Sequence, residues 1–484
     1  MSNSKMRSWV LKITVLMLFV SLVGVLVACS KNANRDKEIQ IFTQLSADGS
    51  QVKELQKIVD EFNAQKTTDK KAVLVNNTDP TTFDTNMQND IPNGRGGDMY
   101  FTFANSALDY VDTHILRLDT ENGLDLDEIV SRTGGLKSGD TFSVDNVVSD
   151  ALRESLSQPG HSGELYSVPL HESGPMMYFN KKIFDELELK IPTSWAELET
   201  VGKIIKEKKD IPMFAPSAPI DFYQTLLVQS GVNYITVDSA GKATVAFDNE
   251  TDRAKIIGIF KYVKRNMDAG IFQFQAAAPA PNSSTLLMEG KIASYQGSNS
   301  HESTMTNSDA AKEAVESGKF ELLVGKNLQG GINLDGTGGE VGEDGQPVSV
   351  GHTLWTPAFN RQIFVTKSNE ARQAGAIEFI KFFTTKEINA RWAAANTVVS
   401  PFKDARDQQV FKDALAKSQA MNVAIESKPM TDSNKITIFG GKSQIRNATA
   451  NQFKKVVDKE SEIEESGWDG VITALITELK NELK

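Results

Sequence analysis

The chain has 484 residues, of which 40 % are hydrophobic and 24 % charged, and this is the composition of a globular protein rather than a disordered or fibrous one. Its 63 acidic and 52 basic side chains give a formal net charge of −11, which argues against a nucleic-acid partner because phosphate binding needs a basic surface. A single cysteine argues against internal disulfides, and a length beyond what one core supports predicts two or three domains.

The N-terminal residues 1–28 have the pattern of a secretory signal peptide, with a basic head followed by a largely apolar run at 13–28. Leu-Val-Ala-Cys at 26–29 resembles a bacterial lipobox, in which the cysteine follows the cleavage site and receives the lipid; the alternative is an ordinary signal peptide with an incidental cysteine. We therefore predict lipidation at Cys29, followed by a polar tether at 29–36. The mature chain, with 49 basic and 63 acidic residues, would lie on the outer face of the bacterial cytoplasmic membrane and contact it by the lipid anchor only.

Strands and helices then alternate along the chain. We expect strands at 38–43, 71–75 and 97–103 and helices at 51–63 and 82–89. This order is typical of an α/β unit with a largely parallel sheet. Ligands of such sheets bind beyond the carboxyl ends of the strands, which makes Gln44 and Asp48 candidates after the first strand and Asn105 a candidate after the third.

The second half of the chain continues the mixed pattern. We expect strands at 163–169, 176–180 and 363–366, and helices at 181–187, from Ser194 onward, at 371–384 and in the tail at 461–484. Residues 301–350 are rich in glycine and acidic side chains, above all at 327–350, and they predict a long surface loop.

Three groups of segments resemble, in order, the extracellular solute-binding proteins of bacterial ABC importers, in the group that includes the maltose-binding and glycerol-phosphate-binding proteins. They are GELYSVP at 163–169 with MYFNKKIF at 177–184 and PTSWAEL at 192–198; MEGKIASY at 288–295; and AIEFIKFFT at 376–384 with WAAAN at 392–396. The resemblance runs over nearly the whole mature chain. It implies an α/β fold of two lobes, joined by a hinge of crossing strands, with a central ligand cleft.

The resemblance also implies which segments form each lobe and what the protein does. Lobe 1 would take residues 37–171 and 302–385, and lobe 2 would take 172–301 and 386–484. The lobes would close on a small-molecule solute, and the permease subunits of the importer would detect the closed form. We expect a monomer that binds a carbohydrate without a cofactor.

Two polar sets are candidates for ligand binding. His171, Glu172 and Ser173 lie where the family crosses between lobes, at the floor of the cleft, and could either contact ligand or hydrogen-bond the hinge backbone. A second set follows an expected strand end and offers amide and hydroxyl groups suited to sugar hydroxyls: Gln296, Ser298 and Asn299.

Aromatic side chains could stack on the C–H faces of a sugar. Phe222 and Tyr223 lie where sugar-binding relatives often place a tryptophan, and the alternative is that they belong to the core. Trp355 is the best single candidate, because it lies in an expected loop before a strand.

One departure from the family concerns Asn360 and Arg361, where the family often has two glycines. An arginine favours an anionic ligand such as glycerol phosphate or a sugar acid, because its guanidinium pairs with carboxylate or phosphate. The alternative is an ion pair with a nearby surface acid, which the acidic composition favours. The net charge leads us to expect a neutral mono- or oligosaccharide rather than an anion.

Catalytic and metal-binding motifs are few. The Gly-Lys-Ser at 441–443 lacks the first glycine of a phosphate-binding loop, and the five histidines have no metal-ligand spacing. We therefore expect neither catalytic residues nor a metal site. The rival interpretations are an exported lipoprotein enzyme acting on glycosides, with carboxylates such as Asp48 and Glu172, and a surface adhesin or assembly factor on the same scaffold.

Overall fold

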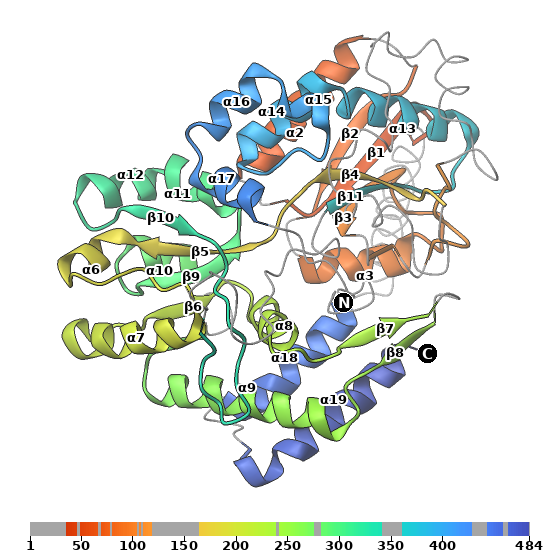
Figure 1. Ribbon diagram of the computed structural model, residues 1–484. Helices are drawn as coiled ribbons and strands as arrows, with labels where there is room; N and C mark the ends of the chain where they lie inside the picture. Colours follow the sequence, from red (N-terminus) through yellow and green to blue (C-terminus); the bar gives the residue numbers. More distant parts are fainter. Residues whose placement is uncertain are drawn as a thin grey trace, which may run out of the picture.

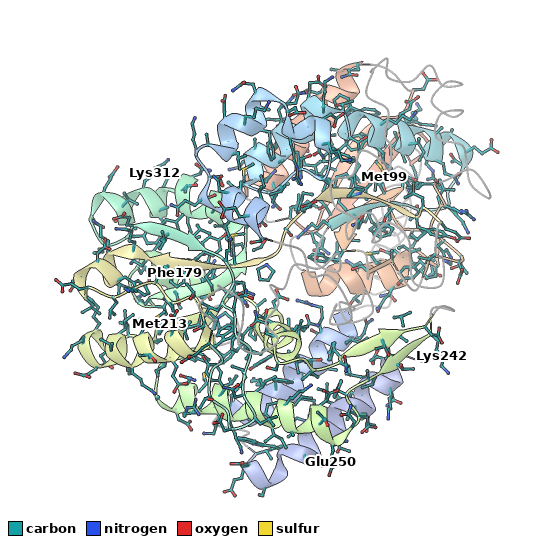
Figure 2. All side chains as sticks on the ribbon, viewed as in Figure 1. Met99, Phe179, Met213, Lys242, Glu250 and Lys312 are labelled. Carbon is teal, nitrogen blue, oxygen red and sulfur yellow. The ribbon has the colours of Figure 1, made fainter. Side chains whose placement is uncertain are left out.

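The computed structural model describes residues 35–45, 49–65, 69–77, 80–103, 106–107, 110–118, 164–238, 242–274, 282–340, 361–427, 443–457 and 463–483. These residues form two α/β lobes, each built around its own sheet (Figure 1). Figure 2 shows side chains throughout both lobes, with Met99 in the first and Phe179 and Met213 in the second. Among the described helices, none is both long and apolar enough to cross a membrane.

The sheet of the first lobe has five strands in the order β2-β1-β3-β11-β4. Their bounds are β1 (Glu38–Thr43), β2 (Lys71–Asn76), β3 (Met99–Phe103), β4 (Ser167–His171) and β11 (Arg361–Val365). β1 is parallel to β2 and β3, whereas β11 runs antiparallel between β3 and β4. The carboxyl ends of β1, β3 and β4 and the start of β11 therefore share one edge, where Arg361 lies opposite both Phe103 and His171.

Alternate residues of these strands bury opposite faces of the first sheet. One face, which includes Phe101, packs against α2 (Ser50–Gln65), α13 (Glu370–Phe383) and α14 (Lys386–Asn396). The other face, which includes Tyr100, packs against Phe83 and Met87 of α3 (Pro80–Asp90). The strand and helix predictions for 38–103 and the helix at 371–384 are confirmed to within a few residues, because each segment has the apolar period of its element.

The sheet of the second lobe has four strands in the order β10-β5-β9-β6. They are β5 (Pro175–Asn180), β6 (Phe214–Pro216), β9 (Ser294–Ser298) and β10 (Leu322–Gly325). One face packs against α7 (Trp195–Lys209), α8 (Pro219–Gln229), α9 (Glu250–Asp268), α18 (Ser443–Val457) and α19 (Trp468–Glu482). The other face packs against α10 (Ser283–Met288), α11 (His301–Asn307) and α12 (Asp309–Glu316).

Smaller elements complete the described chain. They are α6 (Lys181–Glu186), α15 (Lys403–Arg406), α16 (Gln409–Leu415), α17 (Gln419–Glu426), the antiparallel pair β7 (Ile235–Val237) and β8 (Ala243–Val245), and short 3-10 turns at Arg35–Lys37 and Glu465–Gly467. The expected start of a helix at Ser194 is confirmed, since the Ser194 side chain accepts a hydrogen bond from the backbone N–H of Glu197. The tail helix is confirmed as α19, which packs on α9 and α18.

The segment expected to be a surface loop contains helices and a strand in the first part of its described length. Residues 301–340 contain α11, α12 and β10, and the remainder, 341–350, lies outside the described residues. α12 exposes most of its surface, since only Ala311 of its eight residues is buried, and its alanine, lysine and glutamate residues favour a helix. The expectation of a loop is therefore wrong for 301–325, whereas the described residues 326–340 contain no helix or strand, as expected.

The lobe boundaries differ from the expected ones in two places. Residues 302–340 belong to the second lobe, because β10 pairs with β5 through Leu322 opposite Asn180. Residues 386–415 belong to the first lobe, because α14 packs on α2 and α16 packs on α14. The apolar strand β10 needs an edge to pair with, and β5 offers one.

Candidate functional site

The chain passes from one sheet to the other between His171, the last residue of β4, and Pro175, the first residue of β5. In the second sheet Ser298, at the end of β9, lies opposite Pro175. The first sheet's edge at the carboxyl ends of β1, β3 and β4 and the second sheet's edge at the end of β9 therefore border the same crossing. This boundary is where both sequence-predicted polar sets lie.

Backbone pairing ties the crossing to the segment after α14. The backbone N–H of Glu172 donates to the carbonyl of Val399 over 2.9 Å, and the Val399 N–H donates back over 3.3 Å. The fully buried Asn299 donates its side-chain amide to the Glu172 carbonyl over 3.4 Å, and Thr397 donates its hydroxyl to the Asn299 carbonyl over 3.2 Å. The Asn299 side chain thus holds the hinge backbone, whereas Glu172 takes part in these hydrogen bonds only through its own backbone groups.

The Glu172 carboxylate faces a cation. Its Oε1 lies 3.4 Å from Nη2 of Arg406, and both side chains are largely buried. Burial raises the pKa of Glu172 and lowers that of Arg406, and their mutual attraction opposes both shifts. Ser173, also buried, continues the same crossing.

His171 is buried and packs against Trp392 of α14, with the two rings stacked at a centroid distance of 6.1 Å. The indole N–H of Trp392 donates to Nδ1 of His171 over 3.2 Å. Because Nδ1 is the acceptor, the neutral ring carries its proton on Nε2. Burial, and then the nearby Arg361 charge, lower the pKa of His171 to about 3, so the ring stays neutral at physiological pH.

The edge of the first sheet also presents neutral polar groups after β1 and β3. Gln44 follows β1, is buried, and donates its amide to the Thr102 hydroxyl of β3 over 3.5 Å. Thr102 in turn donates to the hydroxyl of Ser106 over 3.3 Å. Gln44 therefore lies at the carboxyl ends of the parallel strands, as expected from its position after the first strand.

Arg361 begins β11 at this edge, and its surroundings are unusual for this chain. The guanidinium carbon lies 5.1 Å from the ring centroid of Phe103, and Nη1 is buried without a hydrogen-bond partner. Burial lowers the pKa of Arg361 to about 10. Among the described residues, each of the nine other arginines pairs with a carboxylate: Arg35, Arg95, Arg117, Arg253, Arg265, Arg372, Arg391, Arg406 and Arg446. The alternative of an ion pair for Arg361 is therefore not observed in the described part of the chain.

The edge of the second sheet forms a network of amides. Gln296 of β9 is buried and donates from Nε2 to Oδ1 of Asn327 over 2.8 Å and to the hydroxyl of Thr225 over 3.4 Å. The partly buried Ser298 donates its hydroxyl to Oδ1 of Asn299 over 3.2 Å. Asn327 was missed because it lies in the segment assigned as a loop, two residues after β10. Gln296, expected after a strand end, lies inside β9.

The two aromatic candidates on α8 lie in the core of the second lobe. Phe222 is fully buried against Trp195, Phe214 and Phe272. Tyr223 is 2 % exposed and packs on Phe274 and Phe453, with ring centroids 5.6 and 4.5 Å away. Every residue from Phe222 to Gln229 is buried, so α8 is surrounded on all sides. Phe222 and Tyr223 therefore both belong to the core of the second lobe, which was the alternative, and neither is part of the candidate site.

The remaining expected positions lie outside the described residues: Cys29, Asp48, Asn105, Trp355 and Asn360. Sequence reasoning also passed over Phe103 and Arg406, which contact the candidates Arg361 and Glu172. Within the described ranges no group of three or more histidine, cysteine, aspartate or glutamate side chains could hold a metal ion.

Known proteins of the same fold give independent information. A family model for bacterial extracellular solute-binding proteins matches residues 57–419. An ABC substrate-binding protein from Listeria monocytogenes, solved in complex with cycloalternan, matches with a TM-score of 0.65 and 17 % identity over 92 % of this chain and 98 % of that one. The cyclic alpha-maltosyl-1,6-maltose binding protein from Arthrobacter globiformis matches with a TM-score of 0.61 and 16 % identity over 92 % and 99 %.

A third solved structure has a ligand of another kind. UgpB from Mycobacterium tuberculosis, in complex with glycerophosphocholine, matches with a TM-score of 0.66 and 14 % identity over 92 % of this chain and 99 % of that one. No curated protein is detectably similar in sequence. At these identities the structural matches establish the two-lobed fold, while the family model covers well over half of the chain. The chain therefore belongs to the bacterial extracellular solute-binding proteins, the binding components of ABC importers.

Proposed function

We propose that this protein captures a carbohydrate between its two lobes and delivers it to the permease of an ABC importer while a lipid at Cys29 anchors it to the membrane. The observation that carries the proposal is the meeting of two polar strand edges at one crossing. The first edge supplies Gln44, His171 and Arg361, and the second supplies Gln296 and Ser298. Such groups suit the many hydroxyls of a sugar.

The ligands of structurally similar proteins support a carbohydrate. Two of the similar proteins have names or complexes that specify oligosaccharides, namely cycloalternan and cyclic maltosyl-maltose. We also include in the proposed site the sequence candidates Asp48, Asn105, Trp355 and Asn360, with Trp355 as the stacking aromatic.

The hinge supports a binding role over glycoside cleavage. Glycoside hydrolysis needs two carboxylates placed on either side of the bond, and Glu172 is instead held against Arg406 and the hinge backbone. Closure about this hinge would give the permease a distinct liganded shape. We propose that the protein acts as a monomer.

A thermal-shift screen of the mature chain tests the carbohydrate assignment. A ligand that binds only the folded state stabilises it by about 2.7 kcal/mol at a concentration 100 times its Kd, so a true ligand should raise the Tm by several degrees. The panel includes glucose, maltotriose, cyclic oligosaccharides, sugar acids and sugar phosphates, with amino acids and short peptides as the control class. Stabilisation by the control class alone would contradict the proposal, and release of reducing sugar from a glycoside would favour an enzyme.

The anchor is tested by Cys29→Ala. Because the proposed lipid is attached through this thiol, the variant should either leave the membrane fraction or remain unprocessed, with an unchanged melting temperature of the folded body. The measurement is fractionation of cells followed by mass determination. A variant of mature size that stays acylated and membrane-bound would show that Cys29 is not the anchor.

A further inference from the structure

We infer that the solute carries a carboxylate or phosphate group and that Arg361 binds this group. The inference rests on the proposed function, since it names the class of solute for the same site. It replaces the neutral sugar expected from the net charge.

The first step concerns the charge balance around Arg361. Its side chain makes no hydrogen bond or ion pair with the described residues, and its Nη1 is buried. Removing a guanidinium from water without a partner is costly, and the Phe103 ring offsets this cost only in part. In a chain with 63 acidic and 52 basic residues, an arginine left without an acid is a departure from the pattern of the nine other described arginines. A ligand anion would supply the missing partner.

The second step concerns position. Arg361 lies at the edge formed by the carboxyl ends of β1, β3 and β4, which is where ligands of α/β sheets bind. Its strand neighbours in register are Phe103 and His171, both of which are uncharged. The nearest acid along the crossing, Glu172, is paired with Arg406. The cation therefore remains available to an incoming anion.

The third step concerns the type of group recognised. A guanidinium offers parallel N–H groups that match the two oxygens of a carboxylate or phosphate. His171, neutral with its proton on Nε2, adds a further donor and no acidic group at this edge. The overall negative charge of the protein does not oppose this, because charges more than about 10 Å away are screened at physiological salt whereas a direct partner is not.

The binding test uses matched probes and matched variants of the mature chain. Isothermal titration measures glucose, glucuronate and glucose 6-phosphate, maltotriose, and the non-sugar anions glycerol 3-phosphate and citrate, each at low and high salt. Arg361→Gln removes the positive charge, and Arg361→Lys keeps the charge but lacks the parallel N–H groups of the guanidinium. Arg95→Gln is the control, because Arg95 is 65 % exposed and paired with Asp90.

We expect an acidic sugar to bind, with at least a tenfold loss of affinity in Arg361→Gln, a smaller loss in Arg361→Lys and no change in Arg95→Gln. A neutral sugar bound equally well by Arg361→Gln would overturn the inference and leave the carbohydrate function standing. A non-sugar anion that binds only with Arg361 present, while no sugar binds, would support the inference and overturn the carbohydrate function.

A second measurement needs no ligand. If Arg361 lacks a structural partner, Arg361→Gln should raise the Tm of the unliganded protein, because an uncompensated charge is removed. Arg391→Gln, which breaks pairs with Glu54 and Glu61, should lower it. A Tm of Arg361→Gln several degrees below that of the wild type would show that Arg361 is held by the fold, and the inference would fail.

Discussion

The two sheet edges that border the hinge differ in the charge and the pairing of their buried polar groups. The edge of the second sheet is neutral, and its buried Gln296 hydrogen-bonds with Asn327 and Thr225, although Nδ2 of Asn327 is itself buried without a hydrogen-bond partner. The edge of the first sheet holds a cation, Arg361, that the described residues leave without an acid. A buried cation without an anion costs more free energy than a neutral amide that lacks one hydrogen bond, so a ligand can recover more free energy at the first edge than at the second.

The hinge between the edges provides an internal reference. Arg406 is also largely buried, but it has Glu172 at 3.4 Å. Arg361 and Arg406 thus compare an unpaired with a paired arginine at one boundary. Substitutions that remove a charge from each should change stability in opposite directions.

The largest effect is expected for Glu172→Ala. It leaves the Arg406 guanidinium buried without its partner, and breaking a buried pair in this way should lower the free energy of unfolding by about 3 kcal/mol. Urea denaturation measures it, and Glu313→Ala on the exposed side of α12 is the control, with a change within about 0.5 kcal/mol. The double variant Glu172→Leu with Arg406→Leu should recover most of the loss. Equal losses in the single and double variants would show that backbone pairing, and not charge, holds the hinge.

The second prediction concerns acid stability and one histidine. The folded pKa of His171 is lowered to about 3 from its ordinary value of 6.5, so between these values the unfolded chain binds a proton that the folded chain does not. Stability must therefore fall as the pH drops below 6.5, by up to about 1.4 kcal/mol per pH unit from this residue. His301, with a pKa lowered to about 4 by burial, acts in the same direction, while the raised pKa values of Glu172 and Glu302 act in the opposite one.

The difference between wild type and His171→Gln isolates that contribution. Urea unfolding at pH 6.5 and 4.5 should show a smaller loss of stability in the variant, because glutamine takes up no proton and its carbonyl can still accept from Trp392. Parallel curves for the two proteins would mean that His171 is protonated in the folded state, and the neutral donor beside Arg361 would be lost.

Sequence reasoning reached the fold and the position of the hinge, because apolar periods and the resemblance to the family are local signals. Gln44 follows β1 as expected, and His171 ends β4 next to the expected crossing, whereas Gln296, expected after a strand end, lies inside β9. Sequence reasoning could not see that β10 returns to the edge of β5, because strand order depends on pairing between residues more than 140 positions apart, such as Asn180 and Leu322.

The same limit applied to side-chain partners. The aromatic residues of α8 would form the same sequence pattern whether they stacked on a sugar or packed in the core. Only the packing of Phe222 against Trp195 distinguishes the two interpretations. Similarly, the composition favoured a surface ion pair for Arg361, although composition does not say which acids lie within reach. The unpaired state of this arginine is a property of the folded chain.

The smallest expected effect tests the neutral edge. Gln296→Leu removes the donor to Asn327 and Thr225 and leaves the buried Oδ1 of Asn327 without this hydrogen bond, which should lower the free energy of unfolding by about 1–2 kcal/mol. Gln56→Leu, on the exposed face of α2, is the matched control and should change stability by less than about 0.5 kcal/mol. Because the removed group is uncharged, any loss of affinity for a glucuronate or glucose 6-phosphate probe should be the same at low and high salt, unlike the loss in Arg361→Gln. A salt-dependent loss in Gln296→Leu would instead mean that the second edge also takes part in binding the charge, and the division of roles between the two edges would not hold.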